Sequence, residues 1–205
     1  SIGSFSDNLS MLEPKVEYMD GMWRMRFVTT LAESSKSTWP DYTIYYTDSM
    51  DGISNWSDPI RLFGPEEGYY DSVVTKIPNA YAMVVTRNSN LYQRSPYPEQ
   101  GIWWLQSKCL SPDRKDWSKQ PVPILKPSAK DGGWYANGMC GPSLVCDNTE
   151  GDRGQLYVFF VATTTRTNWA TQTLKNVVSG KLPPAPAPYY FAIGRLAISI
   201  PQDNS

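Results

Sequence analysis

The stretch LEPKVEYMDGMWRMRF, residues 12–27, has a counterpart later in the chain in YDSVVTKIPNAYAMVV, residues 70–85. The two segments align without gaps at an offset of 58 residues, so that Glu13 falls on Asp71. A third copy follows at an offset of 128 residues, so that Pro142 falls on Pro14. Repeats of this period indicate stacked supersecondary units, which narrows the choice of folds.

Each copy reads as strands separated by turns. In the first copy apolar residues alternate over 12–18, and Asp20-Gly21 is a hairpin signal. The predicted strands are 12–18, 22–30, 42–47 and 60–63 in the first copy, 71–77, 80–87, 101–106 and 122–125 in the second, and 141–146, 156–163 and 190–200 in the third. Copies of four antiparallel strands, three in the last copy, indicate the blades of a β-propeller.

We therefore expect an all-β chain in which residues 1–205 form a single propeller-like domain or fragment, with repeats at about 11–63, 70–125 and 140–200. A β-sandwich of the same strands is the structural alternative, although it does not account for the repeat. Propellers close with roughly 4–8 blades. Three copies thus predict part of a larger ring, or a ring completed by another chain or by self-association.

Composition excludes several classes of partner. The chain has 19 basic and 20 acidic residues, whereas nucleic acids and anionic membranes both need a basic surface. No apolar run approaches the roughly 20 residues of a membrane-spanning helix, and no signal-peptide pattern opens the sequence. We expect neither nucleic acid nor membrane as partner. The sequence does not determine the compartment; we favour an extracellular or periplasmic one.

The side chains available for chemistry are few in kind. There is no histidine, and the three cysteines have no CxxC spacing, so we expect no metal and no cofactor. The cysteines are interpreted as small buried residues, with a Cys140–Cys146 disulfide as the alternative. Without histidine, neither a Ser-His-Asp nor a Cys-His site is possible.

The predicted strand directions place the long connections together at one end of the propeller. That end collects aromatic, amide and guanidinium side chains, which suit the apolar faces and hydroxyls of sugar rings. The candidate substrate-binding residues there are Tyr70, Arg87, Trp134, Tyr135 and Asn137. By contrast, Trp23 and Tyr81, in the middle of predicted strands, are expected to wedge blades together in the core.

Glu13 and Asp71 are the candidate catalytic pair. Both begin a predicted inner strand at equivalent repeat positions, so both carboxyl groups should approach the propeller axis at the long-loop end. Glycoside hydrolysis uses two carboxyl groups across the scissile bond. The structural alternative is that Glu13 caps its strand and Asp71 hydrogen-bonds a loop.

The blades resemble those of the five-bladed propeller glycosidases, the group that contains glycoside hydrolase families 43, 32, 62 and 130. The resemblance rests on EPKVEYMDGMWRMRF, on YYTDSMDGISNW and on GYYDSVVTKIPNAYAMVV, and it covers about residues 11–200. It implies a carboxylate–proline strand start, an Asp-Gly hairpin, a Ser-Asp-Trp turn and activity on carbohydrate.

The sequence departs from that family's pattern near Glu13. The family's acid usually lies two residues before the proline, where this chain has Leu12. A shift of one residue sends a strand side chain to the opposite face unless a bulge restores it. In addition, Lys15 replaces a carboxylate that some members carry, and the early blade that supplies the family's general base has no counterpart here.

The leading hypothesis is a glycoside hydrolase-like propeller that hydrolyses or binds a glycan on its long-loop face. In it Glu13 is the acid, Asp71 positions the substrate or tunes that acid, and Arg87, Trp134 and Tyr135 form the sugar platform. The sequence leaves open whether the chain is an enzyme. The alternatives are a non-catalytic glycan-binding propeller and a structural module whose exposed edges pair with another chain.

Overall fold

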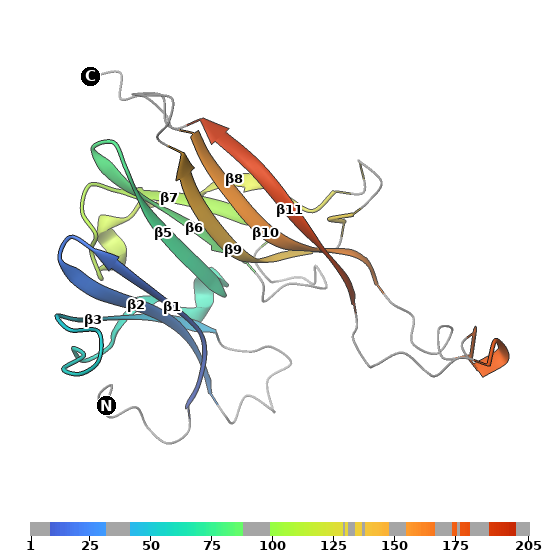
Figure 1. Ribbon diagram of the computed structural model, residues 1–205, viewed down its shortest axis with the longest axis horizontal. Helices are drawn as coiled ribbons and strands as arrows, with labels where there is room; N and C mark the ends of the chain where they lie inside the picture. The colour runs from blue at the N-terminus through green and yellow to red at the C-terminus, as the bar shows by residue number, and fades with distance from the viewer. Residues whose placement is uncertain are drawn as a thin grey trace.

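A computed structural model of the chain shows three antiparallel sheets (Figure 1). It describes residues 9–31, 42–87, 99–128, 130, 134–136, 138–147, 155–166, 174–175, 177–180 and 189–199. Asn137 and the other residues between these ranges lie outside the described part of the chain.

Each sheet is formed by consecutive strands, as expected of propeller blades. Blade 1 contains β1 (Leu9–Met19), β2 (Met22–Leu31), β3 (Thr43–Ser49) and β4 (Ile60–Phe63). Blade 2 contains β5 (Asp71–Ile77), β6 (Ala80–Thr86), β7 (Ile102–Ser107) and β8 (Val122–Leu125). Blade 3 contains β9 (Gly138–Asp147), β10 (Gln155–Arg166) and β11 (Tyr189–Ser199).

The blades fan out from their first strands. The central inner strand, β5, contacts both β1 and β9, and these three strands lie next to one another in Figure 1. β1, β5 and β9 run in the same direction in Figure 1, so these three strands begin at the same end of the molecule. The all-β propeller prediction is confirmed, and the sandwich alternative is wrong because three sheets radiate from one side.

Two apolar clusters fill the spaces between neighbouring blades. Between blades 1 and 2 lie Val28, Ile44, Tyr69, Val74, Met83, Trp103 and Trp117 among others. Between blades 2 and 3 lie Ala82, Val84, Trp104, Tyr135, Met139, Leu156, Val158 and Phe160 among others. Strand side chains alternate in direction, so the middle blade contributes to both clusters, and burial on its two faces joins the three sheets.

The outward faces of the two end blades expose large apolar side chains. Trp23 is 37% exposed on blade 1, where it packs against the ring of Tyr18 at 5.2 Å. Phe159 and Ile193 are exposed on blade 3. The expectation that Trp23 belongs to the core is therefore wrong. The aligned residue, Tyr81, is buried because blade 1 covers it, whereas Trp23 faces away from blade 2.

Polar side chains also link blade 1 to blade 2. The buried guanidinium of Arg26 pairs with Glu17 at 2.6 Å, and Glu17 also accepts a 3.4 Å hydrogen bond from the backbone N–H of Val74 on β5. In the turn between β1 and β2, Asp20 accepts hydrogen bonds from Lys76 and Tyr81 of blade 2. These bonds fix the orientation of β1 relative to β5.

Cysteine burial differs from the expectation. Cys109 is exposed, and Cys140 is a half-buried thiol that forms no disulfide. Within the described residues, no helix has the length and apolar character needed to cross a membrane.

Candidate functional site

A β-bulge sets the position of Glu13. The β1–β2 register runs regularly to Leu12 and resumes only at Lys15, so Glu13 and Pro14 form an irregularity in the strand. Glu13 has a φ of 48°, in the left-handed region that non-glycine residues rarely adopt. Bulges re-aim side chains and are common beside active sites. Glu13 lies one residue nearer the proline than the acid of the family does. Such a shift requires a bulge to keep the side chain on the same face, and the strand has a bulge at this point.

Gly141 occupies the corresponding position on β9. It too precedes a proline, has a φ of 58°, and lies at a register irregularity of the β9–β10 pair. Its backbone N–H donates a 2.9 Å hydrogen bond to Oδ2 of Asp71. Blade 3 therefore presents a backbone donor where blade 1 presents a carboxylate.

Asp71 lies between these two positions, at the start of β5, and is only 2% exposed. Its Oδ2 also accepts a 3.4 Å hydrogen bond from the hydroxyl of Thr86, whereas Oδ1 is buried and has no partner among the described residues. The pKa of Asp71 is raised above its ordinary value. Burial is the main cause and the nearby charge of Glu13 adds to it, while the bond from Gly141 and the charge of Lys15 oppose it.

Tyr70 and Tyr42 stand beside this carboxyl pair. Their rings meet edge to face, with centroids 4.5 Å apart and planes at 70°. Burial raises the pKa of both phenols; Glu13 and Asp71 add to the effect on Tyr70, and Asp71 to that on Tyr42. Both phenols therefore stay neutral hydrogen-bonding groups at ordinary pH. Tyr42 was not among the predicted site residues, because its pattern marks only the start of a strand.

Cys140 is the other site residue that sequence reasoning missed. Burial, with further contributions from Asp71 and Glu13, raises the pKa of its thiol to about 11. The thiol is therefore protonated and a poor nucleophile at neutral pH. Its position next to Gly141 was readable in the sequence, but its proximity to Asp71 depends on contact between blades.

Arg87 is held by aromatic rings. Its guanidinium carbon lies 4.2 Å from the ring centroid of Trp103 and 5.1 Å from that of Tyr69. Its Nε is buried without a hydrogen-bond partner among the described residues. Both rings belong to the cluster between blades 1 and 2, so Arg87 packs on that side of blade 2.

Trp134 and Tyr135 pack on the other side of blade 2. Tyr135 is buried in the cluster between blades 2 and 3, and Trp134 stacks on Phe160 with centroids 5.8 Å apart. The structure thus does not bring them together with Arg87 in a single sugar platform. Any role of these residues in binding stays a prediction, as does that of Asn137, which lies outside the described residues.

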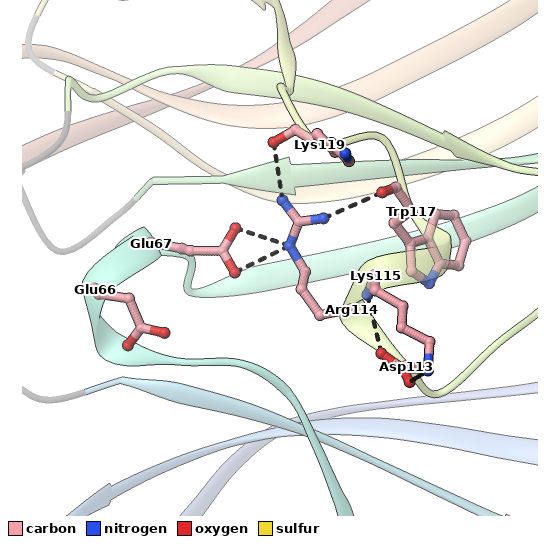
Figure 2. Close-up of a pocket in the computed structure, with 7 residues that line it drawn as sticks. All are labelled: Glu66, Glu67, Asp113, Arg114, Lys115, Trp117 and Lys119. Carbon is pink, nitrogen blue, oxygen red and sulfur yellow. Dashed lines mark hydrogen bonds and ion pairs between the residues drawn. The ribbon is translucent and has the colours of Figure 1, made fainter.

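An open pocket lies at the rim between blades 1 and 2 (Figure 2). It is lined by Glu66, Glu67, Asp113, Arg114, Lys115, Trp117 and Lys119. Arg114 donates to the carboxylate of Glu67 at 2.9 Å and to the carbonyls of residues 117–119, and Lys115 pairs with Asp113. These charges satisfy one another, so we interpret the pocket as part of the packing between the blades.

Within the described residues, no group of three or more Cys, Asp or Glu side chains is arranged to hold a metal ion. At the end where β1, β5 and β9 begin lie the carboxyl groups of Glu13 and Asp71, with the phenol of Tyr70 and the thiol of Cys140 within reach of their charges.

Comparison with known proteins supports the fold. No protein-family model and no curated protein sequence matches this chain. Among solved structures, a glycoside hydrolase has a TM-score of 0.60 at 13% identity, covering 100% of this chain and 60% of its own. A xylan β-1,4-xylosidase from Bacillus halodurans C-125 has a TM-score of 0.54 at 14% identity, covering 95% of this chain and 31% of its own.

The GH43_1 enzyme from Xanthomonas citri, complexed with xylotriose, has a TM-score of 0.53 at 9% identity, covering 95% of this chain and 56% of its own. This chain therefore spans less than two thirds of the length of each of these structures. These likenesses show the fold, which is the propeller fold of the five-bladed glycosidases; the described residues form three blades of it.

Proposed function

We propose that this chain binds a glycan at the end where β1, β5 and β9 begin, and that Glu13 and Asp71 take part in cleaving a glycosidic bond there. The observation that supports the proposal is that these two carboxyl groups, at the starts of neighbouring inner strands, are near enough for the charge of Glu13 to raise the pKa of Asp71. One is exposed on a bulge, and the other is buried with one oxygen unpartnered.

The two carboxyl groups have different roles in this proposal. Glu13 is exposed, so it is the group that reaches the glycosidic oxygen and acts as the acid. Asp71 is buried behind it and acts as a positioning residue, because its charge state changes the electrostatic environment of Glu13. The bond from Gly141 holds Asp71 in place for that role.

Hydrolysis of arabino-, xylo-, fructo- and manno-oligosaccharides by the wild type and by Glu13→Gln tests the proposal. Asp58→Asn is the matched control, because Asp58 is an exposed carboxylate at the opposite end of blade 1. We expect Glu13→Gln to lower kcat by a factor of about 100 or more, as removal of an acid catalyst does, and Asp58→Asn to leave it unchanged. Activity that survives Glu13→Gln would remove Glu13 from the mechanism.

A non-catalytic glycan-binding propeller is the second candidate. It is favoured by Gly141, because blade 3 has no carboxylate at the position that Glu13 holds on blade 1. This candidate predicts saturable glycan binding that Glu13→Gln leaves intact, with no release of reducing sugar by the wild type.

The third candidate is a structural module whose propeller ring is completed by another chain or by a second copy of this chain. It is favoured by the exposed apolar faces of the end blades, which carry Trp23 on one side and Phe159 and Ile193 on the other. Light scattering of the purified protein tests it, with a monomer at all concentrations as the contradicting result.

A further inference from the structure

We propose that Tyr42 and Tyr70 form a binding subsite for one uncharged sugar unit, beside Asp71. This inference rests on the proposed function. It specifies which residues contact the glycan at the end where β1, β5 and β9 begin, and which class of sugar they accept.

The two rings form a rigid aromatic corner. They meet at 70° with centroids 4.5 Å apart, and both residues are half-buried, so part of each residue stays accessible. Both pack against the cluster between blades 1 and 2, and the backbone N–H of Tyr70 donates a 2.9 Å hydrogen bond to the carbonyl of Thr86. A fixed aromatic surface can contact the apolar C–H face of a sugar without an additional loss of side-chain freedom.

The corner adjoins the carboxyl pair. The charges of Glu13 and Asp71 both act on the phenol of Tyr70, and that of Asp71 acts on the phenol of Tyr42. Asp71 is 2% exposed, and its Oδ1 has no hydrogen-bond partner in the described part of the chain. Buried polar atoms of this kind are rare in proteins, and a sugar hydroxyl would supply the missing bond.

The charges around the corner favour a neutral sugar. Glu13 contributes a negative charge when it is ionised, and Lys15 is the cation whose charge reaches Asp71. The guanidinium of Arg87 lies against the rings of Trp103 and Tyr69 in the cluster between blades 1 and 2. A uronic acid here would place a second carboxylate near Glu13, and like charges at close range repel.

Calorimetric titration of the intact protein tests the inference. The neutral probes are xylotetraose, arabinotetraose, mannotetraose and a fructan tetrasaccharide, and the acidic probe is tetragalacturonate. We expect at least one neutral probe to bind, and tetragalacturonate to bind about tenfold more weakly or worse, since about 1.4 kcal/mol of repulsion gives that factor. Tyr42→Ala and Tyr70→Ala should each weaken binding of the neutral probe about fivefold, the scale of one aromatic contact.

Three further variants make the result specific. Tyr70→Phe keeps the ring and should bind within about twofold of the wild type, since the ring face provides the contact. Tyr70→Leu fills the buried space without an aromatic face and should lose binding as Tyr70→Ala does, which guards against an alanine variant that fails to fold. Tyr18→Ala removes an exposed aromatic ring at the other end of β1 and should leave binding unchanged.

The possible failures can be told apart. Wild-type affinity in folded Tyr42→Ala, Tyr70→Ala and Tyr70→Leu would overturn the subsite and leave the proposed function standing. Tetragalacturonate binding as tightly as the neutral probes would overturn the preference for uncharged sugars. Binding of tetragalacturonate alone would overturn the subsite and leave the proposed function standing, whereas a wild type that binds none of the probes would overturn both.

Discussion

The backbone N–H of Gly141, on β9, donates a 2.9 Å hydrogen bond to Oδ2 of Asp71, on β5. The bond crosses from one blade to the next at the end where the inner strands begin. It is available because Gly141 has a φ of 58° at a β-bulge, which turns its N–H out of the β9–β10 ladder. A glycine conformation in blade 3 thus holds the carboxyl group of blade 2.

Replacing Gly141 tests the contribution of this backbone conformation. A Cβ at this position would meet only Cγ2 of Val161 at 3.7 Å, an ordinary contact, so the cost of alanine comes from the left-handed backbone alone. We expect Gly141→Ala to lower the free energy of unfolding by about 1–2 kcal/mol, measured by urea denaturation. Ser143→Ala, on an exposed neighbour, is the control and should be neutral within about 0.5 kcal/mol.

Replacing Glu13 with glycine should change the free energy of unfolding in the opposite direction. It has a φ of 48°, and glycine adopts this conformation without the steric cost that glutamate bears. We expect Glu13→Gly to raise the free energy of unfolding by about 0.5–1 kcal/mol while abolishing activity, the usual exchange of stability for function at strained sites. A Glu13→Gly variant less stable than Glu13→Gln in the same denaturation experiment would show that the left-handed backbone is not strained.

Asp71 should make stability depend on pH. Its folded-state pKa is raised above the ordinary 3.8, so the folded protein binds its proton more tightly than the unfolded chain does. The contribution of Asp71 is therefore most favourable below pH 3.8 and is lost as pH rises through its folded-state pKa.

Asp71→Asn isolates this effect, because it keeps an oxygen that can accept the Gly141 bond. Its stability relative to the wild type should improve as pH rises from 4 to 8, as measured by denaturation at each pH. Asp20 and Asp113 have lowered pKa values and oppose the trend in both proteins, so the difference between the proteins reports Asp71. A difference that does not change with pH would contradict the prediction.

The Glu17–Arg26 ion pair should be a major contact within blade 1, where it joins β1 to β2. Arg26 is 1% exposed, and two of its nitrogens already lack partners among the described residues. Glu17→Ala would leave the charge of Arg26 buried and unpaired, which costs about 3–5 kcal/mol in comparable cases. Lys76→Ala, which breaks the exposed pair with Asp20, is the comparison and should cost much less. Equal losses in the two variants would contradict this ranking.

The pocket in Figure 2 gives a further test of stability. Arg114 bonds to Glu67 and to three consecutive backbone carbonyls, which fastens the β7–β8 connection to the chain that follows β4. We expect Arg114→Ala to lower the free energy of unfolding by about 2 kcal/mol. Arg114→Lys should rescue little of this, because an ammonium cannot reproduce the planar fork. Lys115→Ala, at an exposed site, serves as the control.

Sequence patterns predicted the strands well. The bounds of β4, β5 and β8 agree with the prediction, because alternating side chains and turn residues act locally. The burial of Trp23 was predicted wrongly for a physical reason: its local pattern matches that of Tyr81, but burial depends on whether another blade covers the residue. Local sequence carries no signal for that.

The candidate site was predictable only in part. Alignment of the copies selected Glu13 and Asp71, and the offset near the proline required a bulge that the structure contains. The proximity of Tyr42 and the bond from Gly141 result from contacts between blades, which no spacing within one copy reveals. Arg87 and Trp134 were grouped because both are near long loops, yet they pack on opposite faces of blade 2.

The paired bulges at Glu13 and Gly141 also bear on how such a module can diversify. Each is a short irregularity closed by a proline, and the strand pairing resumes beyond it. A single codon change at such a position can exchange an acidic group for a main-chain donor without re-registering the sheet. New chemistry could therefore be sampled blade by blade, with the scaffold inherited unchanged.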